Sequence, residues 1–84
     1  MTPAEISTAI QASLPDARVE IRDLTGTGDH YQAFVGSDAF EGKSLIQQHQ
    51  LVYKAVGPKV GGEVHALSLK TCTLADFDAV LAKG

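Results

Sequence analysis

Apolar residues recur at two different spacings along the chain, and these spacings predict its helices and strands. Spacings of three or four positions predict helices over residues 3–14 and 44–56, and a short helix that begins near residue 73. Alternating or β-branched and aromatic residues predict strands over 17–24, 31–36 and 64–70. The predicted order is therefore helix, strand, strand, helix, strand, helix.

The ends of the predicted helices carry recognisable signals. Thr2 and Glu5 have the spacing of a capping box, and Pro3 stands at the first helical position, where its missing N–H costs nothing. Pro15 ends the first helix, and Gly57-Pro58 ends the second. Helix boundaries are thus predicted by local chemistry as well as by periodicity.

The connections between the strands predict the sheet topology. The first two strands are joined by the glycine-containing loop 25–29, which indicates an antiparallel hairpin. The second and third strands are joined by a helix, which indicates a parallel pair with a right-handed crossover. We expect one α+β domain, residues 1–84, with a three-stranded mixed sheet and the helices packed on one face.

Composition narrows the classes of function. The 84 residues carry seven basic and ten acidic side chains, for a formal charge of −3, and the basic residues are scattered, which gives no support for tight nucleic-acid binding. The single cysteine cannot form an internal disulfide, which fits a reducing compartment. No apolar run approaches the roughly 20 residues that span a bilayer, and no signal-peptide pattern is present. We expect a cytoplasmic protein without a membrane partner.

Two glycine-based phosphate motifs fail on their spacing. Gly42-Lys43-Ser44 precedes a helix as in a P-loop, but five residues separate Gly36 from Gly42, whereas the motif has four. The GXXG loop with which KH domains clamp a nucleic-acid backbone is absent. The sequence instead predicts a turn with Phe40 in the core and a helix that begins near Ser44.

The histidines are the most informative polar residues. His30 begins the second strand and His65 lies near the start of the third, and parallel strands begin at the same end of a sheet. Each has a plain structural interpretation, His30 as a surface residue and His65 as a partly buried, hydrogen-bonded one. Together they could form half of a metal site, although a closed zinc or [2Fe–2S] site takes four ligands. Cys72 lies toward the opposite end of the third strand, and His49 lies in the second helix; both are interpreted as structural.

Residues 30–53 and 64–71 resemble the BolA family, above all in Phe40-Glu-Gly-Lys-Ser44 and Val64-His-Ala-Leu-Ser68. The resemblance implies a BolA-like fold, which is related to the type II KH domain. It also implies that His65 and His30 are ligands of a [2Fe–2S] cluster. The other ligands would come from the active-site cysteine of a monothiol glutaredoxin and from glutathione. The isolated chain is then expected to be a monomer without a cofactor of its own.

These observations lead to one preferred function and one alternative. The preferred function is that of a non-enzymatic glutaredoxin partner in iron–sulfur trafficking or in iron or redox regulation. The alternative is a KH-like, nucleic-acid-binding transcriptional regulator, because several BolA-like proteins are described as transcription regulators. If the three histidines have no special function, the chain is a small structural module that interacts with other proteins. An enzyme is not expected, since no pair of nucleophile and base is recognisable in the sequence.

Overall fold

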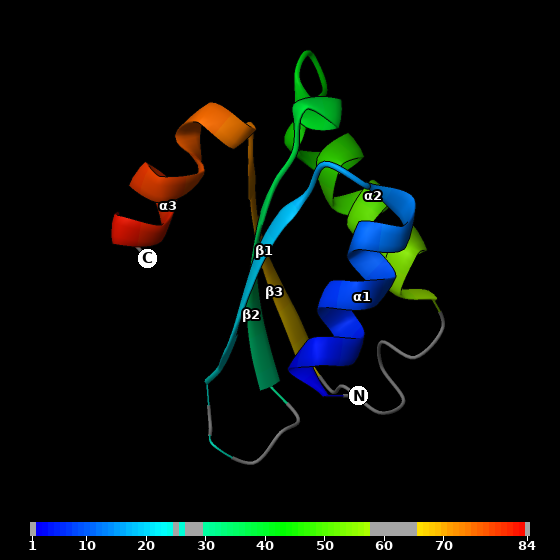
Figure 1. Cartoon of the computed structure of the whole chain (residues 1–84), viewed down its shortest axis with the longest axis vertical. Helices are drawn as coiled ribbons and strands as arrows, with labels where there is room; N and C mark the ends of the chain where they lie inside the picture. Colours follow the sequence, from blue (N-terminus) through cyan, green and yellow to red (C-terminus); the bar gives the residue numbers. More distant parts are fainter. Residues whose placement is uncertain (1, 25, 27–29, 58–65, 84) are drawn as a thin grey trace.

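The computed structural model describes residues 2–24, 26, 30–57 and 66–83, and its elements follow the predicted order (Figure 1). Within these ranges, no helix is long and apolar enough to cross a membrane. The elements are α1 (Pro3–Ser13), β1 (Arg18–Asp23), β2 (His30–Gly36), the 3-10 helix η1 (Asp38–Phe40), α2 (Leu45–Val56), β3 (Ala66–Cys72), the 3-10 helix η3 (Leu74–Asp76) and α3 (Phe77–Lys83).

Capping boxes fix the starts of the two longer helices. The Thr2 side chain accepts a hydrogen bond from the Glu5 N–H, and the Glu5 side chain accepts one from the Thr2 N–H. Ser44 and Gln47 make the same reciprocal pair at the start of α2. These bonds satisfy backbone donors that a helix leaves free in its first turn. At the other end of α2, Gly57 has a φ of +78°, which ends the helix.

The sheet has the predicted topology, with strand order β1-β2-β3. β1 and β2 are antiparallel, with Arg18 opposite Gly36. β2 and β3 are parallel, and their register runs from His30 opposite Ala66 to Gly36 opposite Cys72. The predicted hairpin and the predicted parallel pair are both confirmed.

One face of the sheet carries the main core. α1 and α2 pack side by side on this face, to the right of the sheet in Figure 1, and cover the inward side chains of the strands. Phe40 lies in this core with 1% of its surface exposed, as the sequence predicts. The buried cluster comprises Ile6, Ile10, Leu14, Ala17, Tyr31, Ala33, Val35, Phe40, Val52, Val56 and Leu67.

The predicted fold class is confirmed, but α3 lies on the opposite side of the sheet from α1 and α2 (Figure 1). Because side chains alternate along a strand, Phe34 and Gly36 face away from the main core. Phe77 of α3 fills the space that Gly36 leaves, so that a Cβ atom on Gly36 would lie 2.7 Å from Phe77 Cδ1. The Arg18 guanidinium covers the Phe77 ring, 4.7 Å from its centroid. α3 therefore forms a second, smaller packing layer.

A hydrogen-bonded turn joins the end of β2 to the loop after α1. The Ser37 hydroxyl, which is fully buried, donates to Asp16 Oδ1 at 2.7 Å, and the Asp38 N–H donates to Asp16 Oδ2 at 2.9 Å. The hydrogen bond from Ser37, followed by that from the Asp38 N–H, lowers the pKa of the Asp16 carboxyl. The turn that leads into η1 is thus held by an ionised aspartate.

Gln48 connects the start of α2 to the rest of the fold. Its Nε2 donates to the Lys43 carbonyl at 2.9 Å, and its Oε1 accepts a hydrogen bond from the Thr71 hydroxyl at 2.6 Å. One side chain thereby ties α2 both to the turn before it and to the end of β3.

Replacing Gly36 by alanine should destabilise the protein by about 1–3 kcal/mol, because the added Cβ overlaps the Phe77 ring. Urea unfolding followed by circular dichroism measures this change. In a Phe77→Leu background the cost of Gly36→Ala should be smaller, since the flat ring no longer occupies the site. An equal cost in both backgrounds would show that Phe77 is not the cause.

Asp16→Asn should lower stability at neutral pH and flatten its dependence on acid. The folded state lowers the pKa of Asp16, so the stabilisation is present above the ordinary value of 3.8 and is lost as pH falls through the folded pKa. Wild type and variant should therefore converge in acid when urea midpoints are compared across pH. Glu41→Gln removes a charge from the same turn without touching these bonds and should keep the wild-type profile.

Candidate functional site

His30 lies at the first position of β2, at one end of the sheet. Its side chain is half-buried, and its carbonyl accepts a hydrogen bond of 2.9 Å from the Leu24 N–H. Leu24 is 56% exposed. This end of the hairpin therefore presents a histidine beside an apolar side chain.

The register places His30 opposite Ala66, the first residue of β3. His65, the residue before Ala66 in the sequence, lies outside the described residues. The sequence-based prediction that the second and third strands begin at the same end of the sheet is confirmed by this parallel pairing. Within the described ranges, no group of three or more histidine, cysteine or acidic side chains is arranged to hold a metal ion.

Cys72 lies at the opposite end of β3 from Ala66, as predicted. It pairs with Gly36 and lies six residue steps along the strand from Ala66, a distance of roughly 20 Å. The half-buried thiol lies 3.8 Å from the Val35 carbonyl oxygen. Burial, and then the negative charge of Asp76, raises the pKa of the Cys72 thiol. A thiol held in its protonated form is a poor metal ligand and a poor nucleophile.

His49 lies in α2, as the sequence indicated, and not at the end of the sheet. The side chain is half-buried, and its Nε2 atom is buried without a hydrogen-bond partner among the described residues. One turn further along α2, the Tyr53 hydroxyl donates to the Leu67 carbonyl at 3.1 Å, near the start of β3. This bond ties the last turn of α2 to the end of the sheet where His30 lies.

The turn after β2 does not form a phosphate-binding loop. Asp38–Phe40 form a 3-10 helix, and Phe40 occupies the core where a P-loop would present exposed backbone amides. Gly42 has a φ of +76°, which suits the tight turn that leads to Ser44. The structure thus agrees with the sequence-based exclusion of a P-loop.

Comparison with known proteins gives the family. The model of the family described as "BolA-like protein" matches residues 6–76, which is most of the chain. This chain belongs to the BolA-like family. Within it, an uncharacterised protein of Rickettsia prowazekii is 34% identical over 70 residues, which cover 83% of this chain and 91% of the relative. Human BolA-like protein 1 is 33% identical over 81 residues, and the match spans 88% of this chain but 59% of the human protein.

Solved BolA structures share the fold. A BolA homologue from Coxiella burnetii superposes with a TM-score of 0.77 and 34% identity, over 93% of this chain and 97% of that one. The family includes an Escherichia coli protein named as a DNA-binding transcriptional regulator, 27% identical over 55 residues, which cover 66% of this chain and 52% of that protein. The predicted family and fold are confirmed.

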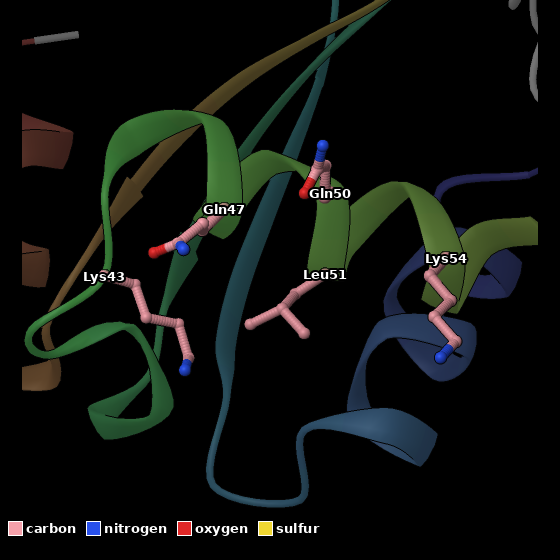
Figure 2. A pocket seen from close by; sticks show the side chains of 5 residues that line it. All are labelled: Lys43, Gln47, Gln50, Leu51 and Lys54. Carbon is pink, nitrogen blue, oxygen red and sulfur yellow. The ribbon is translucent and has the colours of Figure 1, made fainter.

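The structure of this BolA-like chain also shows a groove that the sequence did not indicate. It runs along α2 and is lined by Lys43, Gln47, Gln50, Leu51 and Lys54 (Figure 2). These residues follow helical spacing, but lysine and glutamine on one face of a helix are ordinary surface residues in a sequence. Only the packing of α2 against its neighbours makes the hollow visible.

Alkylation of Cys72 should require a higher pH than alkylation of glutathione under the same conditions. Burial and Asp76 both raise the pKa of the thiol, and the thiolate is the reactive form. The pH dependence of the iodoacetamide reaction, followed by mass spectrometry, measures this. Asp76→Asn should move the profile part of the way toward that of glutathione, since burial remains. Coincident profiles for the wild-type protein and glutathione would contradict the assignment.

Proposed function

We propose that this chain supplies His30 and His65 to a [2Fe–2S] cluster shared with a monothiol glutaredoxin and glutathione. The observation that carries the proposal is the parallel register, in which His30 stands opposite Ala66. One peptide bond separates His65 from that residue. Neighbouring strands lie about 4.8 Å apart, and this close spacing at the paired residues His30 and Ala66 supports the proposal that the two histidines act as a pair. The family resemblance names the same two residues.

The donor set fits half of a cluster site and not a whole one. Imidazole nitrogen ligates iron in Rieske-type clusters, where two histidines replace two cysteines on one iron. Cys72 lies roughly 20 Å along β3 from Ala66, so this thiol is too far away to complete the set. The remaining ligands must come from outside the chain, and the glutaredoxin cysteine and glutathione are thiols of the required kind.

The ligand chemistry gives the shared cluster distinct properties. Neutral imidazole donates less electron density than thiolate, so two histidine ligands should raise the reduction potential above that of an all-thiolate cluster. Imidazole must also lose its proton to ligate, which makes binding weaker in acid. We therefore propose a non-enzymatic, cytoplasmic role in cluster trafficking or in iron or redox regulation.

A second candidate function is favoured by the name of the Escherichia coli relative, a DNA-binding transcriptional regulator. Against it stand the formal charge of −3 and the absence of a GXXG sequence. Nucleic-acid binding through phosphate contacts would weaken steeply with salt and would respond to lysine and arginine substitutions. It would not respond to His30→Ala or His65→Ala, which separates the two functions.

Mixing the protein anaerobically with a cluster-loaded monothiol glutaredoxin and glutathione should give a new visible absorption and circular dichroism spectrum. His65→Ala and His30→Ala should each abolish or alter this spectrum, because each removes one iron ligand. Cys72→Ser should leave it unchanged, since the thiol lies at the other end of the strand. His49→Gln should leave it unchanged as well, since His49 lies within α2.

An unchanged glutaredoxin spectrum with every variant, including wild type, would remove the proposal. Equal effects of His49→Gln and His65→Ala would remove the ligand assignment while leaving the partnership. The experiment therefore tests the sharing of a cluster with glutaredoxin separately from the identity of the cluster's ligands.

A further inference from the structure

The groove along α2 has the size of a site for a small organic molecule. Its volume is about 310 Å³, at the lower end of the range for ligand pockets. Leu51 is partly buried against the main core and gives the groove an apolar floor. Lys43 and Lys54 extend from the two ends of this helix face, on either side of Leu51 (Figure 2).

The groove is positively charged in a chain whose formal charge is −3. Among the described residues that line it, two are lysines and none is acidic. Among the described residues, neither Lys43 nor Lys54 forms an ion pair with a carboxylate. The two ammonium groups are therefore available to an anion from outside the chain.

Gln47 adds a directed donor to the same groove. Its Oε1 accepts the Ser44 N–H at 3.1 Å, and this capping-box bond fixes the orientation of the amide. The amide nitrogen, which can only donate, remains for a ligand. Lys43, Lys54 and the Gln47 amide nitrogen thus offer donors, and a ligand that presents acceptors matches them.

The spacing of the donors indicates the class of ligand. The seven residue steps of helix from Gln47 to Lys54 rise by roughly 10 Å, and Lys43 precedes Gln47, so the two lysines are anchored at opposite ends of the groove. We infer that the α2 groove binds a small organic dianion, with an anionic group at each end and an apolar link over Leu51. Linear dicarboxylates have this form. The site is separate from the histidine end of the sheet and does not depend on the proposed cluster.

Titration of the ¹⁵N-labelled protein with linear dicarboxylates of increasing length tests this inference. Saturable shifts should appear at the Gln47 and Gln50 side-chain amides and along the backbone of α2, and one chain length should bind best. Lys43→Gln and Lys54→Gln should each weaken binding about fivefold, the effect expected for an exposed charge pair. Lys70→Gln removes an exposed lysine from β3 and should leave the affinity unchanged.

The control ligands and added salt show whether binding requires both negative charges of the dicarboxylate. The monocarboxylate and the uncharged diamide of the same length should bind more weakly than the dicarboxylate, and added salt should weaken the dicarboxylate. Equal binding of the diamide, equal weakening by Lys70→Gln, or shifts that never saturate would each overturn the inference. Binding of a single-stranded oligonucleotide in the groove, with no binding of dicarboxylates, would also overturn it and would favour nucleic acid as the ligand.

Discussion

The central strand β2 is the element on which the rest of the structure depends. It pairs with β1 on one side and β3 on the other, and five of its seven residues are buried. Tyr31 and Val35 face the core under α1 and α2, whereas Phe34 and Gly36 face the other layer. A strand enclosed on both edges and both faces has no freedom to shift. The packing therefore determines the positions of both ends of the strand. His30 lies at one end, and Ser37 follows the other.

The position of His30 is consequently set by the buried residues of the same strand. A slip of one residue between β2 and its neighbours would turn every side chain of the strand to the opposite face. Tyr31 and Val35 would then leave the main core, and Phe34 would enter it. The apolar pattern of the strand interior therefore holds the register that places His30 opposite Ala66. The buried apolar side chains of β2 thus determine the position of His30, which is itself partly exposed.

The elements were predictable because their signals are local. The capping box at Thr2 and the helical connection between β2 and β3 depend on residues close in sequence. The layer that α3 occupies was not predictable in this way. The spacing of Phe77, Val80 and Leu81 shows that one side of α3 is apolar, but not which surface it contacts. Gly36, the last residue of β2, is a signal that could have indicated it, because a glycine in a strand often marks a close approach of another group.

The spacing that predicts α2 does not show which of its apolar residues are buried. Leu45 and Ile46, in the first turn of the helix, share the apolar face by spacing but are 60% and 71% exposed. Tyr53 is 41% exposed and uses its hydroxyl to reach β3. The candidate ligands His30 and His65 were identified by family resemblance as well as by topology. The groove along α2 was not predicted from the sequence, because its lysine and glutamine side chains are also typical of an ordinary exposed helix face.

The two ends of the parallel strands differ in chemistry, and this difference bears on the proposed cluster. At one end lies His30, beside the exposed apolar side chain of Leu24. At the other end lies Cys72, whose pKa is raised by burial and by Asp76, so the thiol is disfavoured as a ligand as well as distant. Because Cys72 and His30 lie at opposite ends of the paired strands, this thiol cannot join His30 in one metal site. Under the proposed function, the thiolates therefore come from another molecule, and binding of the cluster would also hold two proteins together.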